Sequence, residues 1–167
     1  MNYLIVPGFG DSDAGHWQSR WAAANADFHR VEQDQWDLAL CSEWCGKLEA
    51  AVAASGADTV LVAHSLGCLL VAAWAAQTKL SIRGALLVAV PDPQGEQFPA
   101  DAHGFDDFPT SALPFPSLVI SSSNDPYATA AFSERTAASW GSCYKMLGAC
   151  GHINTASGFG DWPAGLA

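Results

Sequence analysis

The chain has 167 residues, of which 50% are hydrophobic and 14% are charged, a balance typical of a globular domain rather than a disordered segment. Its 17 acidic and 7 basic residues give a formal net charge of −10, so nucleic acid and anionic membrane surfaces are disfavoured as partners. No apolar run approaches the roughly 20 residues that span a bilayer, and the first residues lack the basic start of an export signal.

The first predicted strand covers residues 3–6 and runs into the loop Pro7-Gly8-Phe9-Gly10. The two glycines, Gly8 and Gly10, allow the backbone to come close to a reacting centre, where the amide of Phe9 can serve as a hydrogen-bond donor. A plain glycine turn at the end of a strand has the same sequence pattern, and this alternative stays open.

A helix is predicted over residues 16–24, and the residue types from Asp11 to Asp13 before it are suited to capping a helix. His16 lies near the start of this helix and has two interpretations. It binds a polar group of a substrate, or it fixes the preceding loop through one hydrogen bond. Trp17 also has two interpretations, as a residue that packs in the core or in a cleft wall, or as a residue that binds substrate.

The most informative segment comes after a predicted strand over 28–32 and a predicted helix over 41–54. Residues 59–63 form an aliphatic, β-branched run typical of a buried strand, and residues 66–77 form an alanine-rich run typical of a helix. Between them lies Ala63-His64-Ser65-Leu66-Gly67, a near match to the Gly-x-Ser-x-Gly motif. In that motif a tight strand-to-helix turn presents a serine as a nucleophile.

Ser65 is therefore the candidate nucleophile. The helix that follows it offers backbone N–H groups, so we expect the amides of Leu66 and Phe9 to bind a developing oxyanion. The alternative is a serine that only caps the helix. His64, directly before Ser65, is interpreted as a supporting residue rather than a participant in the chemistry.

A strand predicted over 84–90 is followed by the longest irregular stretch, residues 91–116, which is rich in Pro, Asp, Gly and Phe. A loop of this length inside a compact domain is usually functional or mobile. It is too short to form a folded cap domain, so we expect an open site. Asp92, near the start of the loop, is one candidate for an acidic residue that would assist the serine.

Asp125 is the stronger candidate acid because it comes just after a strand predicted over 117–122. Beside a nucleophilic serine, such an acid orients the histidine that takes the proton of the serine. The segment Asn124-Asp125-Pro126 is also a good turn sequence, in which the aspartate only bonds its own backbone.

The candidate base is His152, which follows the last predicted strand, residues 143–147. Because the carboxyl ends of parallel strands meet at one edge of a sheet, we expect Ser65, Asp125 and His152 to lie together there. A loop histidine satisfied by backbone groups is the alternative.

Strands alternate with helices along the whole chain, and the last two helices are expected over 128–139 and after residue 154. This is the pattern of a mainly parallel sheet with helices on both faces. The chain order of serine, acid and histidine is that of the α/β-hydrolase fold. We therefore expect one domain over residues 1–167, a three-layer α/β-hydrolase fold with a reduced sheet of about six strands and no large cap domain.

Several segments of the chain also match one family, in the right order. They are Val6-Pro-Gly-Phe-Gly-Asp-Ser12, His16-Trp17-Gln18 with Trp21, Ala63-His-Ser-Leu-Gly67, Ser123-Asn-Asp-Pro-Tyr127, Gly151-His-Ile-Asn154 and Ser157-Gly-Phe-Gly-Asp-Trp-Pro-Ala-Gly165. Through them the chain resembles the small serine hydrolases of the retinoblastoma-binding protein 9 and YdeN-like family. The resemblance implies an α/β-hydrolase fold without a large cap, with Ser65, Asp125 and His152 at the positions of that family's catalytic residues. It also implies a further C-terminal helix, where this sequence stops.

The prediction is a cytoplasmic serine hydrolase that cleaves small, neutral esters, or amides, through an acyl-enzyme. The five cysteines, without an export signal, favour reduced thiols. The sequence has no glycine-rich phosphate loop and no clustered His and Cys ligands, so no cofactor and no metal are expected. Two alternatives stay open: a non-catalytic protein-binding module on the same fold, and an acyltransferase that uses the same residues. The sequence does not identify a protein partner.

Overall fold

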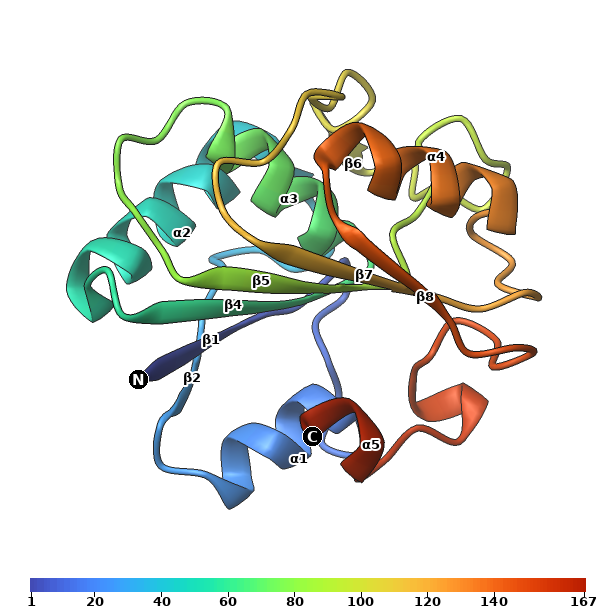
Figure 1. Ribbon diagram of the computed structural model, residues 1–167, viewed down its shortest axis with the longest axis horizontal. Coiled ribbons are helices and arrows are strands. Elements are labelled where there is room, and N and C mark those ends of the chain that lie inside the picture. Colours follow the sequence, from blue (N-terminus) through green and yellow to red (C-terminus); the bar gives the residue numbers. More distant parts are fainter.

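Six strands form a single sheet in the computed structural model, which describes all 167 residues (Figure 1). Every neighbouring pair of strands runs parallel, as expected for a sheet that helices cover on both faces. The sequence predicted all six strands, each to within two residues of its observed ends. In sheet order they are β2 (Phe28–Arg30), β1 (Asn2–Val6), β4 (Thr59–His64), β5 (Gly84–Val88), β7 (Ser117–Ser121) and β8 (Cys143–Met146).

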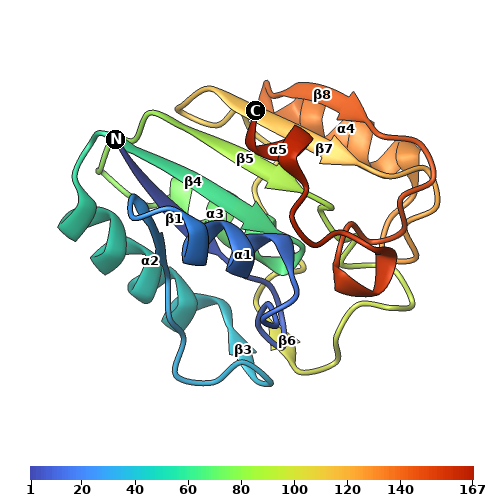
Figure 2. The same ribbon diagram turned by 90° about the horizontal axis from the view of Figure 1, so that it is seen from below.

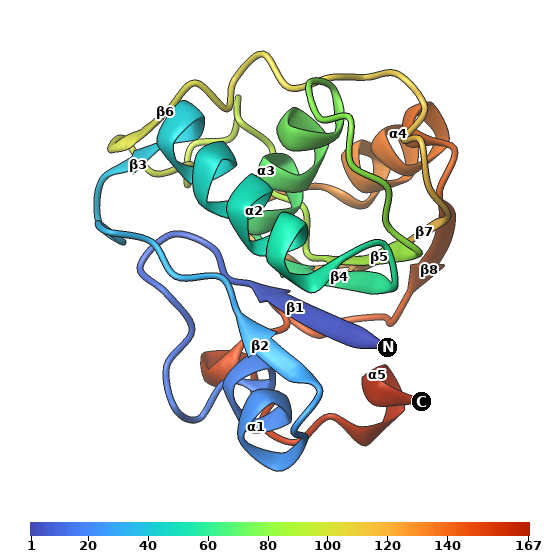
Figure 3. The same ribbon diagram turned by 90° about the vertical axis from the view of Figure 1, so that its left-hand side faces the viewer.

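Helices cover both faces of this sheet. They are α1 (Trp17–Ala24), α2 (Cys41–Ser55), α3 (Leu66–Ala75), α4 (Ala130–Trp140) and α5 (Pro163–Leu166), with a short 3₁₀ helix η1 (Thr155–Ser157) before α5. α2, α3 and α4 lie on one face, and α1 and α5 lie on the other (Figure 3). The three-layer α/β arrangement that the sequence predicted is thus confirmed. None of the helices has the length and the apolar character needed to cross a membrane.

The chain changes direction within the sheet at β1. From β1 it passes through α1 to β2 at one edge, and it then passes through α2 on the opposite face to β4, on the other side of β1. Figure 2 shows the face on which α1 lies in front of β1 and β4. Where the connections of two neighbouring strands leave in opposite directions, a crevice opens at their carboxyl ends. In this sheet the crevice lies between the loop after Val6 and the turn after His64.

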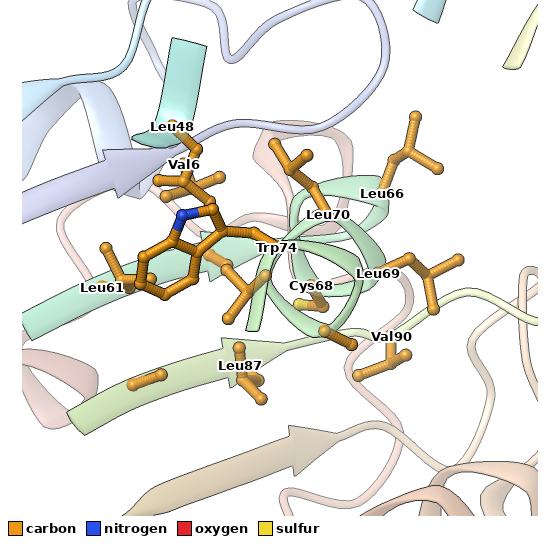
Figure 4. Packing of buried hydrophobic residues seen from close by; sticks show 14 of the residues in the cluster. Val6, Leu48, Leu61, Leu66, Cys68, Leu69, Leu70, Trp74, Leu87 and Val90 are labelled. Carbon is orange, nitrogen blue, oxygen red and sulfur yellow. The ribbon is translucent and has the colours of Figure 1, made fainter. Parts of the chain in front are cut away.

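Two clusters of buried side chains hold the layers together. The larger has 25 buried residues between the sheet and α2, α3 and α4, and Figure 4 shows Trp74 of α3 beside Val6 and Leu61 of the sheet. A fully buried large aliphatic side chain stabilises a fold by about 1.5–3 kcal/mol, so α3, which is apolar on nearly all sides, is firmly held. The smaller cluster has eight buried residues on the opposite face and includes Trp17 and Ile153.

The long loop differs from its prediction. Residues 91–116 were expected to be irregular throughout, but β6 (Ala102–His103) within them pairs in parallel with β3 (Ala39–Leu40). A strand of two residues has no alternating pattern for sequence analysis to detect. The loop is also anchored by Phe105, which is 1% exposed in the larger core. It is therefore a packed part of the domain.

Candidate active site

Ser65 lies at the turn between β4 and α3 in a strained backbone conformation. Its φ is 55° and its ψ is −126°, which non-glycine residues rarely adopt and which costs about 1–3 kcal/mol. Gly67 makes the turn possible, because a Cβ at this position would lie 2.3 Å from the carbonyl oxygen of Val6. The hydroxyl of Ser65 makes no capping bond to α3, so the interpretation of this serine as a simple helix cap is wrong.

Ser65, His152 and Asp125 form a continuous series of hydrogen bonds. Nδ1 of His152 lies 2.9 Å from each carboxylate oxygen of Asp125, and an ionised carboxylate only accepts, so Nδ1 carries the hydrogen. Nε2 of His152 then accepts the hydroxyl of Ser65, whose oxygen is 2.8 Å away. The side chain of Asp125 is 4% exposed, which keeps water from competing for the carboxylate.

Asp92, the rival acid, forms no hydrogen bond with His152. Its carboxylate accepts the amide of Gln94, 2.9 Å away, in the turn that follows β5. Its own amide donates to the carbonyl of Tyr127, in the loop that carries Asp125. Asp92 therefore supports that loop and does not orient the histidine.

The backbone adopts a left-handed conformation on both sides of His152, and it is strained at Ile153. Gly151 has a φ of 56° and Ile153 has a φ of 50°, and the second value is unusual for a β-branched residue. Two buried side chains hold this strained segment. Nε2 of His64 donates to the carbonyl of His152 over 2.8 Å, and Nε1 of Trp17 donates to the carbonyl of Ile153 over 2.9 Å. Bonds from β4 and α1 thus offset the strain and set the position of the ring.

His64 is neutral in this environment. Burial lowers the pKa of His64 well below its usual range, and the nearby imidazole of His152 acts in the same direction. Its Nε2 faces a carbonyl, which only accepts, so the hydrogen of the neutral ring is on Nε2. This agrees with the interpretation of His64 as a supporting residue.

The amides of Phe9 and Leu66 donate to no acceptor within the protein. The loop after β1 passes directly beside the serine. A Cβ built on Gly8 would lie 3.0 Å from the Cβ of Ser65 and 3.2 Å from the amide nitrogen of Leu66. Two unengaged amides close to a serine hydroxyl form the arrangement that stabilises the oxyanion of a tetrahedral intermediate.

A cavity of about 130 Å³ opens beside Ser65. Pro91 and Pro99 reach it from the long loop, and the ring of Tyr127 lies against His152 with 4.2 Å between ring centroids. Sequence analysis did not assign these three residues to the site. Tyr127 could have been assigned, because it belongs to the loop that bears the candidate acid. The lining residues are Gly8, Phe9, Asp11, His16, His64, Ser65, Leu66, Pro91, Pro99, Tyr127 and His152.

Two of the residues expected to bind substrate lie outside this cavity. Trp17 is 0% exposed in the smaller core, where its ring packs 4.6 Å from that of Trp21, so it is a packing residue and its interpretation as a substrate-binding residue is wrong. Gly10 has a φ of 74° and turns the loop, with its amide bonded to the carbonyl of Trp36. The two remaining candidates, Gly8 and His16, do line the cavity.

His16 is the residue that caps α1, a role that the sequence pattern assigned to the segment Asp11 to Asp13. Its Nδ1 accepts the amide of Gln18 over 3.2 Å. Burial lowers the pKa of His16 from 6.5 to about 4, against the opposing charge of Asp13. The ring is therefore neutral near pH 7, and its hydrogen is on Nε2, for which the protein provides no partner.

These parts define a chemistry. The hydroxyl of Ser65 can attack a carbonyl carbon, because an imidazole accepts its hydrogen, a buried carboxylate orients that imidazole and two unengaged amides can bind the oxyanion. No three His, Cys, Asp or Glu side chains come together in a way that could hold a metal ion. The parallel sheet, with this site at the carboxyl ends of its strands, is that of an α/β-hydrolase without a large cap domain.

Comparison with known proteins places the chain within this class. The family model described as "Serine hydrolase" matches residues 3–167, so the chain belongs to that family and is an enzyme, a hydrolase. A YdeN-like hydrolase from Pectobacterium atrosepticum is 32% identical, with a TM-score of 0.89 over 99% of this chain and 86% of that chain. The ydeN gene product of B. subtilis is 20% identical, with a TM-score of 0.77 over 98% and 93% of the two chains.

A more distant similarity concerns the fold alone. A thermophilic esterase from Thermogutta terrifontis is 15% identical, with a TM-score of 0.66 over 92% of this chain and 83% of that chain. Among curated proteins, none matches the chain at a significant level. The substrate therefore has to be argued from the site itself.

Proposed function

We propose that this hydrolase cleaves small, neutral carboxylic esters through a covalent acyl-enzyme on Ser65. The observation that carries the proposal is the unbroken series of hydrogen bonds from Ser65 through His152 to Asp125. Amides are the related substrates on which the same residues would act.

In the first half of the reaction, Oγ of Ser65 attacks the carbonyl carbon while its proton passes to Nε2 of His152. The carbonyl oxygen becomes an oxyanion that accepts hydrogen bonds from the amides of Phe9 and Leu66. Asp125 keeps accepting from Nδ1, which holds the ring in place and stabilises the imidazolium.

The intermediate then collapses. The bond between the carbonyl carbon and the alcohol oxygen breaks, and Nε2 of His152 gives its proton to that oxygen. A water molecule next loses a proton to Nε2 as its oxygen attacks the acyl carbon. In the second collapse, the bond between the acyl carbon and Oγ of Ser65 breaks and Nε2 of His152 returns its proton to Oγ, which releases the carboxylic acid.

The size and charge of the site favour short, uncharged substrates. A cavity of about 130 Å³ is smaller than the roughly 300 Å³ at which pockets for drug-sized ligands begin. The net charge of −10 repels anionic substrates. The name of the esterase from Thermogutta terrifontis is consistent with ester hydrolysis on this fold.

Labelling with a fluorophosphonate probe, followed by intact mass, tests the proposal. We expect the wild type to gain one probe adduct and Ser65→Ala to gain none, because the probe reacts only with an activated serine. Ser111→Ala, which changes an exposed serine far along the chain, is the control and should label like the wild type. A folded wild type that stays unlabelled would contradict the proposal.

A further inference from the structure

The protein contains a buried hydrogen-bond donor that has no acceptor. His16 is 4% exposed, and its Nδ1 is occupied by the amide of Gln18. A neutral imidazole that accepts at one nitrogen donates from the other, so Nε2 of His16 carries the hydrogen. This is the one buried side-chain donor in the chain that no protein atom satisfies.

The two carboxylates whose charges act on this ring already accept hydrogen bonds from other groups. Asp11 accepts the amide of Ser12 and pairs with the guanidinium of Arg30. Asp13 accepts the amide of Gly15 and the hydroxyl of Thr155. Buried polar groups in proteins are nearly always paired, so a donor left open in the free protein calls for an acceptor from outside the chain.

The position of this donor beside the reacting groups suggests what that acceptor is. His16 lines the same cavity as Ser65 and His152. Its ring lies 4.7 Å from that of His64, and the ring of His64 lies 4.9 Å from that of His152, centroid to centroid. The oxyanion is assigned to the amides of Phe9 and Leu66, so a further donor in the same cavity is suited to a different atom of the substrate.

We infer that Nε2–H of His16 binds a second oxygen of the substrate, one outside the reacting carboxyl group. The preferred substrate is then a short ester that carries an ether, hydroxyl or carbonyl oxygen in its acyl or its alcohol part. This assignment rests on the proposed ester hydrolysis and narrows it from small esters in general to oxygen-substituted ones.

Matched substrates measure this preference. In the acyl part, p-nitrophenyl methoxyacetate and p-nitrophenyl butyrate have the same number of non-hydrogen atoms and differ by one ether oxygen. In the alcohol part, 2-methoxyethyl acetate and butyl acetate differ in the same way. The ratio of kcat/KM within each pair, divided by the ratio for hydroxide alone, gives the preference and shows which part of the substrate bears the oxygen.

Two variants separate the donor from the helix cap. His16→Asn keeps an acceptor at the place of Nδ1 and has nothing at the place of Nε2, whereas His16→Gln places an amide nitrogen near Nε2 and loses the cap. We expect the wild type to prefer one oxygen-bearing ester by about tenfold, His16→Asn to lose that preference and His16→Gln to keep most of it. If one of them fails to fold, His16→Phe keeps an aromatic ring without either nitrogen and should also lose the preference.

Two results would overturn the assignment. Equal ratios in the wild type and His16→Asn, for both pairs, would mean that Nε2 bonds a buried water instead. Loss in His16→Gln with retention in His16→Asn would mean that only the cap matters. Fluorophosphonate labelling of the same samples keeps this separate from the proposed function, because a labelled enzyme with unchanged ratios contradicts the role of His16 alone.

Discussion

At the scale of single residues, the site depends on which group accepts the hydrogen bond from Nδ1 of His152. Asp125 does so with both oxygens at 2.9 Å, while Asp92 is occupied by the amide of Gln94. The two aspartates both follow a strand of the same sheet, and only their contacts distinguish them. A matched pair of substitutions therefore tests the assignment.

Asp125→Asn should lower kcat for p-nitrophenyl acetate by about 10⁴-fold, because an amide in its place favours the wrong tautomer of His152. Asp92→Asn should leave kcat close to that of the wild type, since an amide oxygen can still accept from Gln94. Steady-state kinetics on the two variants decides the matter. A severe loss in Asp92→Asn with a mild one in Asp125→Asn would reverse the assignment.

At the scale of elements, the loop around His152 and the turn around Ser65 are both strained, and each is held by particular contacts. The strain at Ile153 is offset by bonds from Trp17 and His64. The strain at Ser65 depends on Gly67, which allows α3 to start against β1. The contacts at Ile153 and the contacts at Gly67 each lead to a separate prediction.

Trp17→Phe keeps an aromatic ring in the core but removes the donor to the carbonyl of Ile153. We expect a loss of about 1–3 kcal/mol in the free energy of unfolding, because a buried carbonyl is left unpaired, together with a lower kcat. Trp21→Phe is the control: it removes a bond to the carbonyl of Asp161, away from the reacting groups, and should leave kcat unchanged. Urea unfolding and kcat for p-nitrophenyl acetate measure both effects. An unaltered kcat in Trp17→Phe would show that this bond does not position His152.

Gly67→Ala should prevent stable folding, because the new Cβ would lie 2.3 Å from the carbonyl oxygen of Val6 and the backbone there has little room to move. Gly46→Ala is the opposite case. Gly46 is an exposed position inside α2 with no atom within 4 Å of a Cβ, so alanine should stabilise the protein by about 0.5–1 kcal/mol. Thermal unfolding checks both, and a Gly67→Ala protein as stable as the wild type would contradict the steric argument.

At the scale of the whole molecule, two buried neutral histidines make stability depend on pH. The pKa of His16 is about 4 in the folded protein and 6.5 in its usual state, so unfolding takes up a proton between these values. The contribution of His16 is complete above pH 6.5 and is lost as the pH falls toward 4, by on the order of 3 kcal/mol. Burial of His64 acts in the same direction.

Urea unfolding at several pH values from about 7 to about 4.5 measures this loss. His16→Asn should show a shallower decline than the wild type, since asparagine does not titrate. Around His16, the carboxylates of Asp13 and Asp11 favour its protonation, and Arg30 and His152 oppose it. Parallel curves for the two proteins would mean that His16 is not responsible.

The sequence was sufficient to predict the sheet and the positions of Ser65 and His152, because each follows a clear strand and a turn that glycine permits. It favoured Asp125 as the acid but left Asp92 open as a rival. That choice depends on β7, which precedes Asp125, lying next to β8, which precedes His152, and strand order is not written in local patterns. Tertiary packing decides it.

Two further features escaped sequence reasoning for local reasons. A pair of two-residue strands, β3 and β6, is too short to produce a periodic signal. The cap of α1 was expected among Asp11 to Asp13 because their side chains are common caps, yet His16 takes the position. Histidine is rarely a helix cap. The cavity that His16 lines offers a reason for a histidine at this position.

The bonds from α1 to the last part of the chain have a consequence for biosynthesis. Trp17 bonds the carbonyl of Ile153 and Arg20 pairs with Asp161, contacts that span 136 and 141 positions. A growing polypeptide emerges from the ribosome N-terminal part first, so α1 waits for its partners until synthesis is nearly over. His152, the candidate base, is synthesised at the same late stage. Ester hydrolysis by a newly made chain would therefore show that the chain has reached its native topology, so the activity of the enzyme can be used to follow its own folding.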